Sequence, residues 1–442
     1  MSYLFLGIVI ICMILGMKIS DVFQALRSQL RKQVLSTVDL PKVAMYAEIS
    51  RDRNSPGLFG EIRFNPHMRL KRFLSPAFTV GYIDNLEIVF RGVMRDLLQQ
   101  YKRRLTECSM AGLAIETDLM DDLHKAALDI MGESSFSRGF GQVNPKSSSS
   151  DTHMDEIWKS IPRAIFDGLA NRYKYVYVKR FLRRVGFDVN FDWPKQMTMA
   201  IDSIVKQRTE SKEDSSSDLL QYLVENGKRP DTEEVMSSRD ILDQMSEILL
   251  AGSETTSGTI ACLFLELARN PRVRYKLLAS LPGMSHHNLE HIVVSKTVRD
   301  SPDYKYLEAC IKENLRLHPI ASEMGRRTGD QWINLMGYDL PPHTVVSASY
   351  RDLHRNGQHW PDAMSFIPER WLPDDQRGDV PAADTDLCLY PSFAWAEMRM
   401  IAANLLSRYD IVEVPGQKVD FRQFITMQFD TGHWRVVLKP RQ

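Results

Sequence analysis

Long stretches of the chain repeat apolar residues at the spacing of an amphipathic helix. From Leu70 onward these stretches are separated by short breaks, and two clear examples are Phe90–Leu105 and Asp118–Met131, the second ending at Gly132. Apolar residues three and four positions apart fall on one face of a helix. The pattern therefore predicts that helices dominate about the first two thirds of the chain.

One stretch, Ile241–Leu267, is apolar on most of its faces, as expected of a helix through the middle of a domain. Its centre nevertheless holds two glycines, hydroxyls and a carboxylate: Gly252, Ser253, Glu254, Thr255, Thr256 and Gly258. Buried polar side chains are costly without partners, whereas Gly252 allows a ligand to approach the backbone. The conflict predicts a site in which an acid and an alcohol relay protons. A helix bent by Ser/Thr bonds to its own backbone is the alternative.

After Pro319 the pattern changes to short β-branched runs flanked by glycine and proline. Residues Gly337–Pro341 and Thr344–Ser349 predict a short hairpin, and Arg435–Leu438 predicts another strand. The expected fold class is therefore mainly α with small β-sheets.

The N-terminus has a different character. Tyr3–Met17 carries no charge, and the charged residues that follow from Lys18 to Lys32 are mainly basic. These 15 residues are fewer than the roughly 20 of a spanning helix. No basic residue precedes the run and no small-residue cleavage site closes it. We therefore expect residues 1–20 to be an uncleaved membrane anchor, and we favour this over a cleaved signal peptide or a core helix. The positive-inside rule then places the rest of the chain in the cytosol.

Composition narrows the function classes. The 442 residues are 43% hydrophobic, enough for a large core, and 56 basic residues balance 56 acidic ones. Without an excess of positive charge, nucleic-acid binding is not expected. The five cysteines are odd in number and show no CxxC spacing, which argues against a disulfide framework and a structural zinc site.

Two further features involve charged residues. Glu313 and Arg316 stand three residues apart and share one helix face, a pairing that is common on solvated helices. Arg370 lies in the Pro-flanked run FIPERW, where its planar fork suits a buried cluster with the other two.

In their order and separation these features resemble the cytochrome P450 family of haem-thiolate monooxygenases. The resemblance runs from about His67 to the C-terminus and includes LSPAF, AGSETT, the ExxR pair, FIPERW and AWAEMR. It implies the cytochrome P450 fold for residues 67–442, preceded by the anchor and by a shortened N-terminal region at residues 21–66. Only 49 residues separate Met17 from His67, where the family normally fits a hinge and several strands.

The resemblance also implies roles for individual residues. Glu254 and Thr255 look like the acid–alcohol pair that delivers protons during oxygen activation. The structural triad behind the haem would be Glu313, Arg316 and Arg370. Haem propionates would be paired by Lys71, with Arg72 beside it, and by Arg326 or Arg327, where lysine supplies a point charge rather than a fork.

The chain departs from the family at its most diagnostic segment, Phe-x-x-Gly-x-Arg-x-Cys-x-Gly. In one alignment Cys388 is the axial ligand, since it stands nine residues before Glu397, the family's usual separation. In the other, the ligand loop is deleted between Phe393 and Ala394. We favour the deletion, because the glycines of the loop are absent around Cys388 and neighbouring aspartates disfavour a thiolate.

Three functional hypotheses follow. The first is a monooxygenase that binds haem, receives electrons from an NADPH-dependent P450 reductase and oxidises an apolar small molecule. Its single-pass anchor would lie in the endoplasmic reticulum membrane with the catalytic domain in the cytosol, and AWAEMR and FIPERW look most like fungal members of secondary metabolism. The second is a haem-free or inactive relative, or a truncated gene product. The third is a membrane-bound binding module that uses the apolar pocket without chemistry.

Overall fold

The computed structural model divides the chain into two compact units. The larger comprises residues 44–308, 391–422 and 428–442, and the smaller comprises residues 1–43, 309–390 and 423–427. Structure is described for residues 40–48, 56–107, 114–144, 178, 181–182, 184–187, 195–210, 218–321, 323–335, 337–383, 392–423 and 427–441. The predicted anchor, most of residues 21–66 and Cys388 lie outside these ranges.

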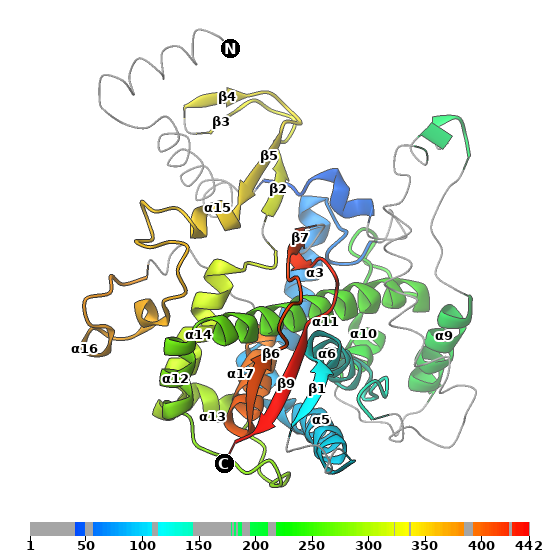
Figure 1. Ribbon diagram of the computed structural model, residues 1–442. Helices are drawn as coiled ribbons and strands as arrows, with labels where there is room; N and C mark the ends of the chain where they lie inside the picture. The colour runs from blue at the N-terminus through cyan, green and yellow to red at the C-terminus, as the bar shows by residue number, and fades with distance from the viewer. Residues whose placement is uncertain are drawn as a thin grey trace, which may run out of the picture. The chain divides into compact units, whose positions relative to one another are not determined.

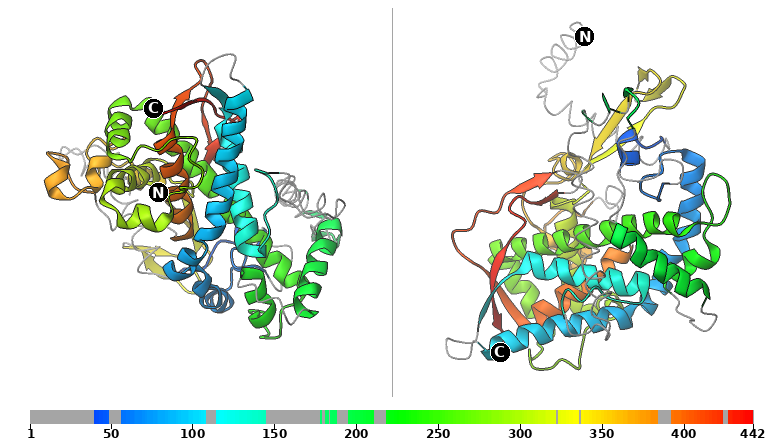
Figure 2. Two further views of the ribbon diagram at one scale, coloured as in Figure 1. Left: turned by 90° about the horizontal axis from the view of Figure 1, so that it is seen from below. Right: turned by 90° about the vertical axis from the view of Figure 1, so that its right-hand side faces the viewer.

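Helices make up most of the larger unit (Figure 1). In chain order they are η2 (Ala44–Glu48), α3 (Phe64–Leu74), η3 (Ser75–Phe78), α4 (Val80–Asn85), α5 (Glu87–Glu107), α6 (Leu119–Phe136), α9 (Lys195–Glu210), α10 (Leu219–Asn226), α11 (Ser238–Arg269), α12 (Pro271–Ser280), α13 (Ser295–Asp300), η4 (Pro302–Tyr304) and α17 (Ser392–Arg408). The long helix α11 runs beside α6, and this is the most extensive packing between two helices in the described part of the chain (Figures 1 and 2).

Helix α11 begins with a capping box, in which the Ser237 hydroxyl accepts from the Asp240 N–H and the Asp240 carboxylate accepts from the Ser237 N–H. Among the described residues it is the one helix long and apolar enough to cross a membrane, but 67% of its most apolar window is buried within the protein. It is therefore a core helix, as the sequence predicts for Ile241–Leu267.

Helix α6 continues past Gly132, where the sequence predicts that it stops. A Cβ added at Gly132 would lie 2.9 Å from the Arg138 carbonyl oxygen and from the Phe140 ring, so glycine serves close packing here. The helix ends at Phe136, and the next residue, Ser137, caps it in the left-handed conformation at φ 55°.

The larger unit also contains a three-stranded antiparallel sheet in the order β1 (Ile115–Asp118), β9 (Arg435–Pro440), β6 (Tyr409–Glu413). The predicted strand at Arg435–Leu438 is confirmed as part of its central strand. Val436 and Leu438 point into the core and are fully buried, as expected for alternating side chains.

The smaller unit holds most of α14 (Lys305–Leu317), together with α15 (Tyr350–His354), η5 (Pro368–Trp371) and α16 (Asp374–Arg377). Its strands pair as β2 (Glu323–Arg327) with β5 (Val345–Ser349) and β3 (Ile333–Leu335) with β4 (Tyr338–Leu340). The prediction of one hairpin from the β4 and β5 segments is thus wrong. Pro341 and Pro342 lack backbone N–H groups, and the two strands they join pair with different partners.

A further pair, β7 (Phe421–Gln423) with β8 (Met427–Phe429), completes the small sheets. The predicted fold class, mainly α with small β-sheets, is therefore confirmed.

Candidate functional site

The centre of α11 is rich in hydroxyls that bond to their own helix. The donors reach the carbonyl oxygen four residues earlier at 2.6–2.8 Å, and they are Ser253, Thr255, Ser257 and Thr259. Such bonds satisfy buried hydroxyl protons without a second element. The backbone bonds that the alternative interpretation expects are thus present for these four hydroxyls, whose lone pairs can still accept hydrogen bonds.

Glu254 and Thr255 are half-buried, whereas Ser253, Thr256 and Ser257 around them are buried. The acid and the alcohol therefore lie on a side of α11 that its neighbours do not fully cover. Because the Thr255 hydroxyl donates to the Ala251 carbonyl at 2.6 Å, it faces any partner as a hydrogen-bond acceptor.

Gly252 has a different role from the one expected. A Cβ at this position would lie 2.4 Å from the Met131 sulfur of α6, closer than atoms can approach. The space beside the glycine is thus filled by a side chain of the protein rather than left to a ligand. Gly252 allows the close packing of α11 on α6.

Thr256 is the exception among the hydroxyls of this turn, because its Oγ1 is buried and has no hydrogen-bond partner. Glu397 of α17, which packs against α11, is likewise fully buried with neither carboxylate oxygen bonded. Burial raises the pKa of Glu397 to about 8, and the nearby Thr256 hydroxyl opposes the rise without making a hydrogen bond of ordinary geometry. Thr256 stands in AGSETT and Glu397 in AWAEMR, but no local signal pairs them, because the two residues lie far apart in the sequence.

The smaller unit brings Glu313, Arg316 and Arg370 together. Arg316 binds the Glu313 carboxylate with two bonds of 2.8 and 3.0 Å, and Arg370 approaches the same carboxylate at 3.4 Å. All three side chains are buried. The pairing at i,i+3 is therefore not the solvated surface pair that its spacing most often indicates.

Further bonds complete this cluster. The Ile367 N–H and the Trp371 indole N–H also donate to Glu313, at 3.0 and 2.9 Å. Arg316 donates to the carbonyl oxygens of His354 and Ala363 at 2.6 and 2.7 Å. Burial lowers the pKa of Arg370 from its ordinary value, while the Glu313 charge opposes that change. The cluster thus ties α14 to the segments around α15 and η5.

The four basic residues singled out for a cofactor have no carboxylate partner among the described residues. Lys71 and Arg72 are exposed at the end of α3 in the larger unit. Arg326 and Arg327 lie on β2 in the smaller unit, where the Arg327 Nε is buried without a hydrogen-bond partner.

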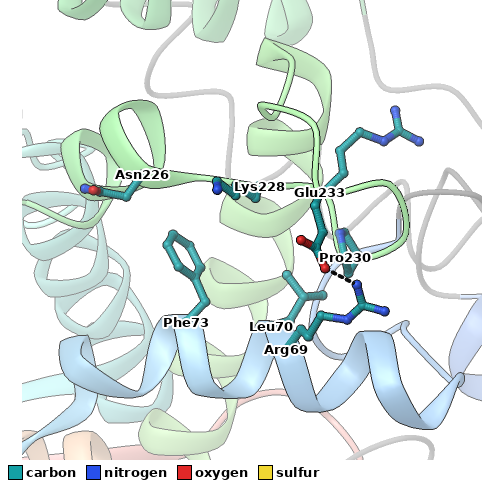
Figure 3. A pocket seen from close by; sticks show the side chains of 8 residues that line it. Arg69, Leu70, Phe73, Asn226, Lys228, Pro230 and Glu233 are labelled. Atoms are coloured by element: carbon teal, nitrogen blue, oxygen red, sulfur yellow. Dashed lines mark hydrogen bonds and ion pairs between the residues drawn. The ribbon is translucent and has the colours of Figure 1, made fainter.

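A cavity of about 250 Å³ that sequence reasoning missed lies between α3 and the loop after α10 (Figure 3). Leu70 and Phe73 of α3 form its apolar side, and an Arg69–Glu233 ion pair of 2.7 Å bridges the two elements. Its remaining lining residues are Asn226, Lys228, Arg229 and Pro230. Lys71 and Arg72 do not line this cavity.

The two described cysteines, Cys262 and Cys310, are both buried. Burial and the nearby Glu266 raise the pKa of the Cys262 thiol well above its ordinary value, which disfavours the thiolate that iron requires. The Cys262 thiol therefore does not suit an axial ligand position.

Each unit, taken by itself, has basic side chains of the chemistry that binds a haem propionate. In the larger unit these are Lys71 and Arg72. In the smaller unit they are Arg326 and Arg327, and the Arg327 Nε is buried without a hydrogen-bond partner. The candidate axial ligand Cys388 belongs to residues 384–391, which lie outside the described ranges.

Comparisons with known proteins agree with this geometry. A model of the family "Cytochrome P450" matches residues 22–428. Cytochrome P450 monooxygenase FUS8 of Gibberella fujikuroi is 27% identical over 422 residues, covering 94% of this chain and 79% of that protein. Cytochrome P450 monooxygenase acrD of Aspergillus aculeatus is 26% identical, covering 87% and 75% of the two chains.

Among solved structures, the crystal structure of a cytochrome P450 (CYP102L1) superposes with a TM-score of 0.69. Its sequence identity is 19%, and the match covers 94% of this chain and 88% of the other. At that identity the likeness concerns the fold alone.

Proposed function

The chain belongs to the cytochrome P450 family, and we propose that it is a fungal-type, haem-dependent monooxygenase that oxidises an apolar small molecule. The observation that carries this proposal is the turn of α11 at Glu254 and Thr255. An acid and an alcohol sit side by side on a partly open face of a helix that is otherwise a core element.

In this proposal Glu254 supplies the exchangeable proton and Thr255 orients the species that receives it. The Thr255 hydroxyl donates its hydrogen bond to the Ala251 carbonyl oxygen. Its oxygen is therefore left to accept a hydrogen bond from a partner. General acid catalysis of this kind contributes about 10²–10⁴-fold to a rate.

A haem, when bound, supplies the oxygen chemistry, and the chain supplies its binding site and its proton path. Lys71, Arg72, Arg326 and Arg327 would pair with its propionates, and Glu313, Arg316 and Arg370 would hold the backbone of the smaller unit in place. At the axial position we favour deletion of the ligand loop between Phe393 and Ala394, and Cys388 is the alternative ligand.

The setting of the enzyme belongs to the same proposal. Residues 1–20 would anchor the chain in the endoplasmic reticulum membrane as a single pass, with residues 67–442 as the catalytic domain in the cytosol. An NADPH-dependent P450 reductase would supply electrons. FUS8 and acrD are named as cytochrome P450 monooxygenases and come from fungi, which supports a fungal-type monooxygenase. The apolar substrate and a role in secondary metabolism are part of the proposal through the resemblance of AWAEMR and FIPERW.

The test is the haem content of the purified full-length chain, expressed with a haem supply and counted against protein. We expect about one haem per chain, and a lower content in the double variant K71M/R327M. Arg69→Met, on the same helix as Lys71, is the matched control and should retain the wild-type content. A chain that folds without haem would favour the haem-free relative instead.

A further inference from the structure

The starting observation is a pair of buried polar groups that face each other across two helices. The Thr256 hydroxyl on α11 and the Glu397 carboxyl on α17 both lie in the interface, and neither has a hydrogen-bond partner. An unpaired buried polar group destabilises the folded protein, so each group gains by pairing with the other.

The surroundings of Glu397 lack a charge that would stabilise a carboxylate. Helix α17 packs against α4, α5, α11, α13 and β6. Ionisable side chains of these elements include Asp84, which pairs with Arg299, and Tyr101, which donates to Asp122. They also include the buried thiol of Cys262 and the buried phenol of Tyr409. On α17 itself, Arg399 pairs with Glu308 and Arg408 bonds to backbone carbonyls. Only desolvation and Thr256 act on the Glu397 carboxyl.

We propose that Glu397 is a positioning residue, whose carboxylic acid O–H donates a hydrogen bond to Thr256, directly or through one bridging water molecule, and so fixes the α11 turn that carries Glu254 and Thr255. The hydroxyls of Ser253, Thr255, Ser257 and Thr259 are bound to the backbone of α11 itself and cannot tie this turn to another element. Thr256 is free to do so. The roles of Glu254 and Thr255 rest on the proposed function, whereas the Glu397–Thr256 bond does not.

The bond makes the turn sensitive to alkaline pH. The pKa of Glu397 is about 8 in the folded protein, above the value of about 4.3 expected when unfolded. Folding therefore takes up a proton between these values, and stability falls as pH rises through that window. Above about pH 8 the folded protein carries a buried carboxylate that can no longer donate to Thr256.

The experiment measures hydrogen–deuterium exchange of the amides of Leu249–Ile260 at several pH values from about 6 to about 9, with each variant compared with wild type at the same pH. In Glu397→Gln the side-chain amide donates at every pH. We expect the wild type to lose protection relative to this variant above about pH 8, and Thr256→Val to show reduced protection at all pH values. Amides of α5 serve as an internal reference and should not follow this pattern.

Ser257→Ala is the matched control, because it removes a buried hydroxyl of the same turn that bonds only to α11. It should keep the pH dependence of the wild type. A carboxylic acid C=O band in the infrared difference spectrum between wild type and Glu397→Gln, present near neutral pH and lost at alkaline pH, gives a second readout.

Identical pH dependence of exchange in wild type and Glu397→Gln, or absence of the infrared band, would overturn the proposal. Both measurements work with or without bound haem. A failure to bind haem would therefore contradict the proposed function while leaving the Glu397–Thr256 bond to be judged separately.

Discussion

At the scale of single residues, Glu313 accepts hydrogen bonds from two arginines, an indole and a backbone N–H, all in the buried interior of the smaller unit. Glu313→Gln leaves two buried guanidinium groups without a counter-charge. We expect a loss of about 3–5 kcal/mol in the free energy of unfolding, measured by denaturant titration.

The control is Glu413→Gln, which removes a carboxylate from the Arg269–Glu413 pair, where the Arg269 side chain is 46% exposed. Its cost should stay within about 1 kcal/mol. Equal losses in the two variants would contradict a structural role for the Glu313 cluster.

Thr255 provides the second prediction at this scale. Thr255→Ala should lower the ratio of product formed to NADPH consumed by about 10²-fold, because the hydroxyl that orients the proton acceptor is lost. The unfolding midpoint should change little, since this hydroxyl bonds only to Ala251 of its own helix. Thr255→Ser should recover most of the ratio, and its failure to do so would point to packing rather than hydrogen bonding.

At the scale of secondary-structure elements, the packing of α11 on α6 is tested at Gly252. Gly252→Ala places a methyl group 2.4 Å from the Met131 sulfur, and we expect a loss of about 1–3 kcal/mol measured by thermal or denaturant unfolding. Gly252→Ala should lower the free energy of unfolding less when it is introduced into Met131→Ala than when it is introduced into the wild type.

Gly92 of α5 is the matched control, because a Cβ there meets no atom within 4 Å. Gly92→Ala should stabilise the protein by up to about 1 kcal/mol, since alanine loses less entropy in a helix. If both substitutions stabilise, the close contact between α11 and α6 is not a constraint.

The same scale shows what the sequence can predict. Apolar periodicity predicts α5 and α11 closely. Helix α5 buries one continuous apolar face, and α11 is buried on most of its faces. It places the end of α6 too early, because glycine is a typical helix stop, whereas at Gly132 the missing side chain allows contact with Phe140. It joins β4 to β5 wrongly, because strand pairing depends on segments distant in the chain.

The residues of the candidate site also differ in whether the sequence alone reveals them. Glu254, Thr255, Glu313 and Arg316 stand in short motifs and are readable from the sequence. The Thr256–Glu397 pair and the cavity beside α3 arise from residues brought together only by folding. Gly252 shows the converse, since its motif suggested a ligand and the structure places Met131 there.

At the scale of the whole molecule, the family assignment rests on the match over residues 22–428 and on the shared fold. The raised pKa of the buried Cys262 thiol makes it unsuited to bind iron. Cys388 has the family spacing to Glu397, whereas its neighbouring residues favour deletion of the ligand loop. The proposed haem-thiolate enzyme is therefore tested at its iron ligand.

The most direct measurement is the carbon monoxide difference spectrum of the reduced, purified full-length chain, compared with Cys388→Ala and with Cys310→Ala as the control. Thiolate ligation predicts the red-shifted Soret band of the family in the wild type and in Cys310→Ala, with loss of this band in Cys388→Ala. A band that persists in Cys388→Ala would reject Cys388 as the ligand. Absence of the band from a folded wild-type chain would contradict the assignment of a haem-thiolate monooxygenase.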